Sequence, residues 1–202
     1  MDIEFMDIEL IKAGLERTGK SKIGLAKALG RQPSAITAML QGQRRVQAEE
    51  VPVIVAYLEL NKVRIMGFVG AGATIEPEFE QVPPEGLDIV ELPFLIPGEL
   101  VAFRVRGDSM FPRYDDGDTI VVWKEQRRPL SSFYGREAAV RTRDGHRFLK
   151  TIQRGKSRGQ VTLLSFNAKP IENVKLEWIG EIELVLRSGQ AQPMQGRKRG
   201  RG

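Results

Sequence analysis

The order of apolar and polar residues divides the chain into a helical first part and a strand-rich second part. Apolar residues recur at helical spacing over 3–15, and shorter helical patterns follow over 22–29, 33–40 and 49–58. After residue 97 the spacing changes to alternation, with many β-branched residues. This second pattern predicts strands over 100–105, 119–123, 138–142, 147–151, 161–165 and 179–186.

Turn and capping residues support the helices predicted in the first part of the chain. Gly19, Gly30 and Gly42 each follow a helical pattern, where a left-handed residue ends a helix. Ser21 is suited to cap the helix that follows it, and Pro33 suits the first turn of the next one. Two short helices joined by a tight glycine turn are therefore predicted.

This helix pair resembles the helix-turn-helix of phage-repressor-type regulators. The resembling residues are Leu25–Gly30, Ile36, Met39 and Gly42. The resemblance makes 33–40 the recognition helix. We expect base edges in the major groove to be read by Gln32, Ser34, Thr37, Ala38 and Gln41. We expect DNA phosphates to be contacted by Lys22, Lys27, Arg31, Arg44 and Arg45. The alternative is a helical bundle that binds nothing.

Charge and composition narrow the function classes. The net charge is +5, yet 17–48 carries seven basic and no acidic residues, and 65–103 carries seven acidic and no basic ones. A basic helical module fits a nucleic-acid partner. The absence of cysteine and the single histidine exclude disulfides, a cysteine nucleophile and sites with several histidine ligands. We therefore expect no metal and no cofactor, and a disordered basic tail over 189–202.

A motif in the strand-rich part resembles the signature of the LexA-type self-cleaving repressors. It comprises Val105–Pro112, which contains Gly-Asp-Ser-Met, followed by Asp116–Val122. The resemblance implies a serine–lysine dyad, with Ser109 as the nucleophile and Lys150 as the base. Backbone N–H groups at Ser109 and Met110 are the expected oxyanion donors.

A lysine can act as a base only when it is neutral, which requires burial to lower its pKa. Lys150 lies among apolar neighbours that favour such burial, whereas His146 follows a predicted turn and is expected to be exposed.

The resemblance also implies that the substrate is the chain itself. The expected cut lies in the connecting segment, at an Ala–Gly bond upstream of the serine, and this segment offers Ala71–Gly72. The alternative is that these small residues form only a flexible linker. The predicted organisation is multidomain: an all-α helix-turn-helix domain (1–64), a linker with the cleavage segment (65–97), a mainly-β LexA-type peptidase and dimerisation domain (98–188), and the tail (189–202).

The leading hypothesis is a dimeric transcriptional repressor that inactivates itself by cleavage. Its expected partners are a double-stranded DNA operator, a second copy of the chain through the strand 179–186 as a sheet edge, and, by resemblance, a RecA filament formed after DNA damage. No signal peptide or spanning segment is evident in the sequence, so no membrane partner and a cytoplasmic location are expected. The alternatives are a repressor whose second domain only dimerises or senses another partner, and a protease acting on other proteins.

Overall fold

The computed structural model describes residues 6–70, 83 and 86–189. The chain forms two compact units. The first, which we call the helical unit, contains Met1–Lys62 and Leu92–Gly98, and the second, the sheet unit, contains Val63–Glu91 and Glu99–Gly202. None of the helices in the described part of the chain has the length and apolar character needed to cross a membrane.

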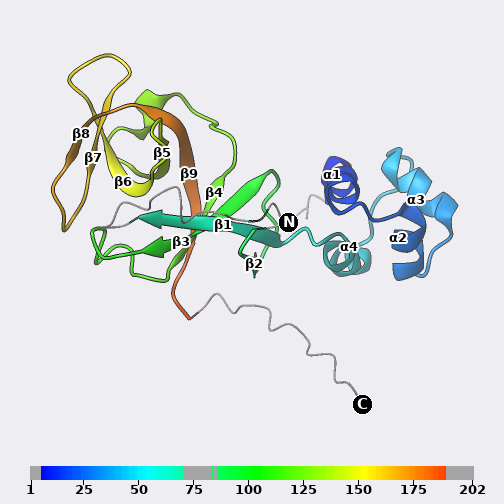
Figure 1. The fold of residues 1–202 in the computed structure, drawn as a ribbon. Coiled ribbons are helices and arrows are strands. Elements are labelled where there is room, and N and C mark those ends of the chain that lie inside the picture. Colours follow the sequence, from blue (N-terminus) through cyan, green and yellow to red (C-terminus); the bar gives the residue numbers. More distant parts are fainter. Residues whose placement is uncertain (1–5, 71–82, 84–85, 190–202) are drawn as a thin grey trace. The chain divides into compact units, whose positions relative to one another are not determined.

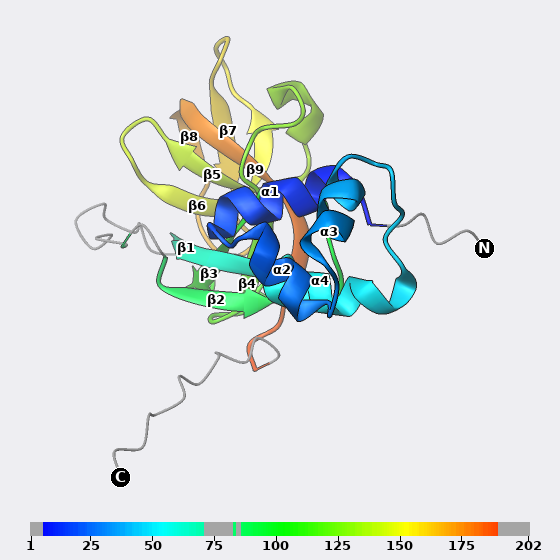
Figure 2. The ribbon, with the colours of Figure 1, turned by 90° about the vertical axis from the view of Figure 1, so that its right-hand side faces the viewer.

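The helical unit confirms the helices that the apolar spacing predicts. Within the described residues it contains α1 (Ile8–Thr18), α2 (Lys22–Ala28), α3 (Pro33–Leu40), the short 3-10 helix η1 (Ala48–Glu50) and α4 (Val51–Leu58). α2 and α3 lie side by side in both views (Figures 1 and 2). The first helix runs from Ile8 to Thr18, with Asp7 as its N-cap, whereas its apolar pattern predicts 3–15.

Short polar side chains and glycines set the ends of these helices. Ser21 caps α2, its hydroxyl accepting a hydrogen bond from the N–H of Gly24 over 3.0 Å. Pro33 stands at the start of α3, where its missing N–H has no intrahelical partner to lose. Gly19 and Gly30 adopt φ of +65° and +62°, the left-handed conformation expected from their positions.

The apolar faces of the helices meet in one core. Ile36 and Met39 of α3 pack in the same cluster as Leu25 and Ala26 of α2, which joins the two helices tightly. The fully buried large side chains of this core are Ile11, Leu25, Ile36, Met39, Ile54 and Leu58. The core therefore fixes which face of α3 remains outward.

Among its described residues, the sheet unit contains nine strands in the order β2-β1-β3-β4-β9-β5-β6-β7-β8. A short 3-10 helix, η3 (Leu130–Phe133), precedes β5. The strands are β1 (Lys62–Gly70), β2 (Asp88–Glu91), β3 (Leu100–Arg106), β4 (Thr119–Trp123), β5 (Glu137–Thr142), β6 (Arg147–Arg154), β7 (Val161–Leu164), β8 (Ile171–Val174) and β9 (Leu176–Leu186).

The last strand, which was expected to be a sheet edge, lies inside the strand order, although each of its halves pairs on one side only. β9 lies between β4 and β5 and pairs with both (Figure 1). Its first half, through Glu181, pairs with β5, and its second half, from Ile182, pairs with β4. Alternating apolar residues suit an inner strand as well as an edge, so the sequence pattern alone did not distinguish them.

Part of the segment that the sequence suggests is a linker forms β1 and β2. β1 runs parallel to β3, and Val63, Ile65 and Val69 are buried along it. Its register shifts between Ile65 and Phe68, around Gly67. A bulge at a glycine interrupts the alternation of apolar residues, so the strand pattern is hard to recognise in the sequence.

Candidate active site and candidate DNA-binding face

Ser109 lies in a tight turn that directly follows β3. Gly107 N donates to Oδ1 of Asp116 over 2.7 Å, and Phe111 N donates to the carbonyl of Asp108 over 2.9 Å. Gly107 adopts φ of +96°, which residues with a side chain rarely do. The turn leaves Ser109 only 1% exposed, so its hydroxyl is held in a fixed and largely dry position.

Lys150 reaches the same place from β6, in the hairpin that β6 forms with β5. It pairs with Ala138 of β5 and is 2% exposed. Its Nζ donates a hydrogen bond to Oγ of Ser109. The fold therefore brings together the two predicted residues, which lie 41 positions apart in the sequence.

Burial changes the protonation of Lys150. Desolvation lowers its pKa from 10.5 to about 8, because the charged amine loses water. Phe148 and Ile152, two residues away on either side along β6, are buried with it and share its face by alternation. Roughly one such lysine in ten is neutral at pH 7, and roughly nine in ten at pH 9. The amine can therefore accept a proton at near-neutral pH.

The predicted oxyanion donors are the backbone N–H groups of Ser109 and Met110. Neither N–H donates a hydrogen bond to another described residue. The carbonyl of Ser109, in contrast, accepts two hydrogen bonds, from the N–H groups of Phe166 and Asn167, each over 2.9 Å. Two donors that have no acceptor among the described residues, next to a fixed hydroxyl, are suited to stabilise an oxyanion.

Asn167 is a residue of this site that the sequence analysis missed. Its Nδ2 donates to the carbonyls of Asp108 over 3.2 Å and Phe111 over 2.9 Å, in addition to the backbone bond to Ser109. The loop after β7 is thus tied to the turn by its side chain and its backbone. A lone asparagine between two strands gives no signal of such a role in the sequence.

Asp118 anchors the same turn from its other end, and the sequence analysis gave it no role of its own. It is fully buried, and its Oδ2 accepts hydrogen bonds from Asp115 N over 3.0 Å and from Nη1 of Arg187 over 2.7 Å. Its Oδ1 accepts from Ser188 N over 2.8 Å. Its position in the sequence, at the end of an acidic turn and just before a buried strand, could have indicated this role.

The predicted cleavage site, Ala71–Gly72, lies outside the described residues. The last described residue before it, Gly70, ends β1 and is paired in parallel with Phe148 of β6. Phe148 precedes Lys150 by two residues on that strand. The described chain therefore leads up to this bond alongside the strand that carries Lys150.

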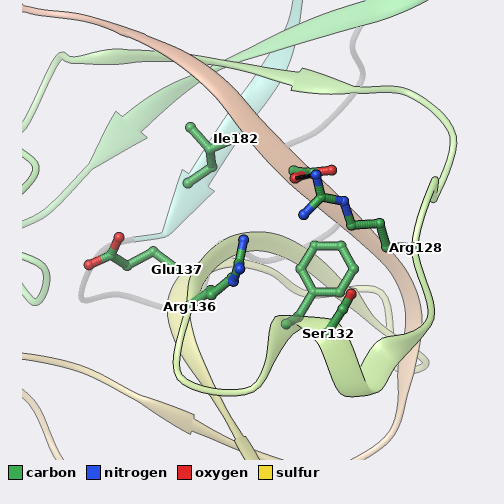
Figure 3. A pocket seen from close by; sticks show the side chains of 7 residues that line it. Arg128, Ser132, Arg136, Glu137 and Ile182 are labelled. Carbon is green, nitrogen blue, oxygen red and sulfur yellow. Dashed lines mark ion pairs between the residues drawn. The ribbon is translucent and has the colours of Figure 1, made fainter.

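A separate small cavity of about 100 Å³ lies between η3 and β9 (Figure 3). Neither Ser109 nor Lys150 lines it, and two of its charged side chains, Arg128 and Glu181, form an ion pair over 3.2 Å. Its lining residues are Arg128, Ser132, Phe133, Arg136, Glu137, Glu181 and Ile182. The cavity is thus distinct from the Ser109–Lys150 pair.

In the helical unit, α3 turns the predicted base-reading residues outward. Four of the five are exposed and Ala38 is half-buried, while Ile36, Met39 and Leu40 of the same helix are buried. The exposed residues of this face are Gln32, Ser34, Thr37 and Gln41. Gln32 is the N-cap residue of α3 and makes no capping hydrogen bond with its side chain, so its amide is available to a partner.

The five predicted phosphate contacts fall into two groups. Lys22, Lys27 and Arg45 are exposed. Arg31 and Arg44 instead bind Glu50, over 3.1 Å and 2.6 Å to its Oε1.

Glu50 is 5% exposed. Burial alone would raise its pKa, but hydrogen bonds from Arg44, from the backbone of Gln47 and from Arg31 hold the pKa below its usual value. This carboxylate therefore stays charged and fixes both arginines beside α3.

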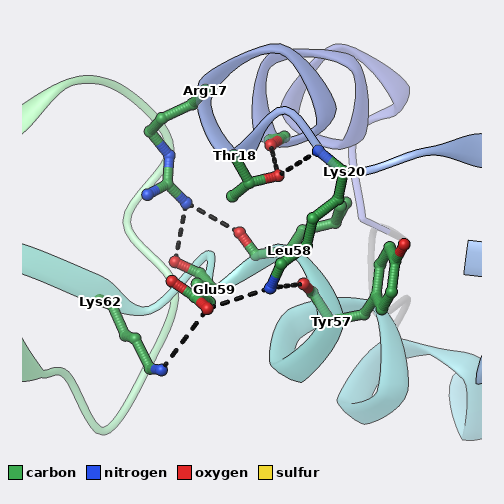
Figure 4. A network of polar contacts seen from close by, with 8 residues as sticks. Arg17, Thr18, Lys20, Tyr57, Leu58, Glu59 and Lys62 are labelled. Carbon is green, nitrogen blue, oxygen red and sulfur yellow. Dashed lines mark hydrogen bonds and ion pairs between the residues drawn. The ribbon is translucent and has the colours of Figure 1, made fainter. Parts of the chain in front are cut away.

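Two further basic residues of the same run bind the C-terminal end of α4. Arg17 donates to the carbonyls of Leu58 and Glu59 over 2.9 and 2.8 Å, and Lys20 donates to the carbonyl of Tyr57 over 2.6 Å (Figure 4). These carbonyls belong to the C-terminal turn of α4 or directly follow it, where they have no intrahelical donor. The cations therefore cap α4, a role that the charge run did not indicate.

Comparison with known proteins identifies the family of the sheet unit. The family described as Peptidase S24-like matches residues 64–183, which is more than half of the chain. The matched range contains the Ser109 turn and all of β6, including Lys150, and it confirms the expected LexA-type C-terminal domain. No curated protein matches the chain. The chain belongs to the Peptidase S24-like family.

Proposed function

We propose that this protein is a DNA-binding transcriptional repressor that inactivates itself by cutting its own chain between Ala71 and Gly72. The observation that carries the proposal is the buried Lys150 amine hydrogen-bonded to Oγ of Ser109. Membership of the Peptidase S24-like family supports the peptidase function. The outward polar face of α3 supports the DNA-binding function.

The chemistry begins when Lys150 is neutral. Its Nζ takes the proton of the Ser109 hydroxyl, and Oγ attacks the carbonyl carbon of Ala71. The N–H groups of Ser109 and Met110 stabilise the negative oxygen that develops there. The C–N bond to Gly72 then breaks, and Lys150 returns the proton to the departing amine.

A second half-reaction restores the serine. Lys150 takes a proton from water, the resulting hydroxide attacks the ester between Ser109 and Ala71, and the ester bond breaks. The proton then returns from Lys150 to Oγ of Ser109. The net change is hydrolysis of one peptide bond, without a metal or cofactor.

The placement of β1 supports this choice of substrate. Gly70 is already hydrogen-bonded alongside β6, two residues from Lys150 in register. The Ala71–Gly72 bond directly follows Gly70 in the sequence. An intramolecular substrate has a high effective concentration, which offsets a slow base.

We assign DNA binding to the helix pair α2 and α3, because these two short helices joined at a glycine resemble a helix-turn-helix. In this assignment α3 enters the major groove, and the exposed cations Lys22, Lys27 and Arg45 contact phosphates with the Glu50-held Arg31 and Arg44. Repression requires two copies on a palindromic operator. Cleavage would separate the reading module from the dimerising domain and remove the gain in affinity that two linked modules provide.

The proposed trigger, by resemblance to LexA-type repressors, is a RecA filament formed after DNA damage. Such an activator would act by holding the Ala71–Gly72 segment against Ser109. It would also exclude water from Lys150, which favours the neutral amine.

The direct test is self-cleavage of the purified full chain. Incubation from pH 7 to pH 10, with and without an activated RecA filament, should produce two fragments whose masses define a cut at Ala71–Gly72. Ser109→Ala should abolish the fragments at every pH, because it removes the attacking oxygen. Gly72→Glu should block the cut by bulk and charge. Intact wild-type protein at every pH would instead favour a repressor whose sheet unit only dimerises or senses a partner.

DNA reading is tested separately by selecting bound duplexes from a randomised pool. The Ser34→Ala/Thr37→Ala double variant should bind the selected sequence more weakly by about 1–3 kcal/mol per lost base contact, with little change on random DNA. Equal losses on both DNAs would place the base-reading surface elsewhere.

A further inference from the structure

Three buried side-chain atoms in the described part of the chain lack a hydrogen-bond partner. They are Nη1 of Arg44, Oγ1 of Thr119 and Oγ of Ser165. Leaving a buried polar group unpaired is unfavourable, so each such group in a native structure calls for an explanation. Ser165 is the one of the three that adjoins the Ser109–Lys150 pair.

The strand register places Ser165 across from Lys150. Thr151 of β6 pairs with Leu164, the last residue of the antiparallel strand β7. Continuing this register by one residue sets Ser165 opposite Lys150. Directly opposed residues of antiparallel strands share a face, with Cβ atoms about 5 Å apart. The two side chains therefore start from neighbouring positions on one side of the sheet.

The same segment is attached to the nucleophile. The two residues after Ser165, Phe166 and Asn167, donate their backbone N–H groups to the carbonyl of Ser109, each over 2.9 Å. Ser165 is therefore fixed between the base on one side and the backbone of the nucleophile on the other. A free hydroxyl in this position cannot drift away from the pair without breaking those bonds.

Lys150 needs a second acceptor when it becomes charged. A neutral amine has two N–H donors, whereas the ammonium has three. Within the described residues, Oγ of Ser109 is the one hydrogen-bond partner of Nζ. Ala138, directly opposite Lys150 on β5, is apolar, as is Leu163 of β7, which is paired with Ile152, and burial is the cause of the lowered pKa of Lys150.

We propose that Ser165 is a positioning residue for Lys150, whose Oγ accepts a hydrogen bond from Nζ when that amine carries a proton. This inference rests on the proposed self-cleavage and deepens it. In the conformation described, Nζ donates to Ser109 and Oγ of Ser165 stays unpaired. When the proton of Ser109 passes to Nζ, the new N–H turns to Ser165, which stabilises the ammonium and keeps Nζ in line with the nucleophile.

The first measurement is the pH profile of self-cleavage. Ser165→Ala should lower the plateau rate about tenfold, the effect of losing one hydrogen bond to a charged group. It should also move the midpoint of the profile to lower pH, since the ammonium loses an acceptor. Ser165→Thr keeps the hydroxyl and should restore both values. The matched control is Thr119→Val, which removes another unpaired buried hydroxyl of the same unit and should leave the profile unchanged.

The second measurement does not depend on cleavage. NMR titration of the Lys150 side chain, in the full chain carrying Gly72→Glu, should give a lower pKa when Ser165 is replaced by alanine. This titration tests Ser165 even if no variant is cleaved, so failure of the proposed function and failure of this inference remain distinguishable. An unchanged Lys150 pKa in Ser165→Ala, or a fall in rate without a shift of the midpoint, would overturn the positioning role.

Discussion

Two buried ionisable side chains, Glu50 in the helical unit and Lys150 in the sheet unit, differ in how burial affects their charge. Glu50 in the helical unit is 5% exposed and Lys150 in the sheet unit is 2% exposed. Glu50 is hydrogen-bonded to two guanidinium groups, and its pKa is held below the usual value despite its burial. Lys150 has an uncharged serine as its partner, and its pKa falls to about 8.

The difference shows that burial alone does not decide what a charged group does. Opposite charges keep a buried carboxylate ionised, so it serves as a fixed structural anchor. Without an opposite charge, a buried amine can lose its proton at near-neutral pH and exchange it with a neighbouring hydroxyl. The first arrangement stabilises a unit, and the second makes it reactive at a cost in stability.

Replacing the lysine should give the largest effect, on both activity and stability. Lys150→Met should abolish self-cleavage, because methionine cannot accept a proton. It should also stabilise the sheet unit at pH 7 by about 3 kcal/mol, the equivalent of lowering a lysine pKa from 10.5 to about 8. Urea unfolding checks this through Trp123 and Trp178, the two tryptophans of the chain, which both lie in the sheet unit.

The extra stability of Lys150→Met over the wild type should decrease as pH rises. Below pH 8 the wild-type lysine is charged in both states and the full penalty applies. Between about pH 8 and 10.5 the unfolded chain binds more protons, so wild-type stability rises and the gap to Lys150→Met closes. Both proteins should carry Gly72→Glu to prevent cleavage. A gap that stays constant through this window would mean that packing, and not charge, causes the difference.

Removing the charge of Glu50 should change stability in the opposite direction to the lysine replacement. Glu50→Gln should destabilise the helical unit by about 2 kcal/mol, since two guanidinium groups lose their carboxylate, one of them half-exposed and so partly screened. Far-UV circular dichroism follows the helices during unfolding. Glu49→Gln, an exposed neighbour, is the matched control and should change little.

Acid should reduce the stability that Glu50 gives to the helical unit. The pKa of Glu50 is lowered by folding, so its contribution is present above the unfolded value near 4.5 and is lost as pH falls below it. The wild-type helical unit should therefore lose stability in this range, and Glu50→Gln should lose less. Equal acid sensitivity of the two proteins would contradict the anchoring role of this carboxylate.

The comparison also explains what the sequence could predict. Helical spacing and glycine turns located α2 and α3 to within one residue, because local propensity and the buried face agree there. The pairing of Ser109 with Lys150 was expected from resemblance to a family motif, since no local rule relates residues so far apart. The register shift at Gly67 interrupts the alternating pattern of β1, so this strand was not predicted. The pairing of β9 depends on β4 and β5, which its own sequence does not specify.

The anchors of both sites were harder to predict for a related reason. In the sequence, Glu50 has no feature that distinguishes it from other acidic residues at a helix start, and Asn167 has none that distinguishes it from other loop residues. Each is defined by what the fold places opposite it: Arg31 and Arg44 in the first case, the Ser109 turn in the second. Sequence patterns report a residue's own element, whereas these roles arise from contacts between elements.

The smallest expected effect concerns two adjacent arginines. Arg45 is exposed and Arg44 is bonded to Glu50. Arg45→Ala should weaken binding to random duplex DNA and reduce the salt slope of log K by about 0.9, one phosphate contact, without changing stability. Arg44→Ala should reduce the slope similarly and also destabilise the helical unit, because Glu50 loses its shortest ion pair. Fluorescence anisotropy from 50 to 200 mM salt, with unfolding curves for both variants, separates the two. If Arg45→Ala leaves the slope unchanged, this part of the helical unit does not touch the DNA backbone, and the assignment of phosphate contacts must move to Lys22 and Lys27.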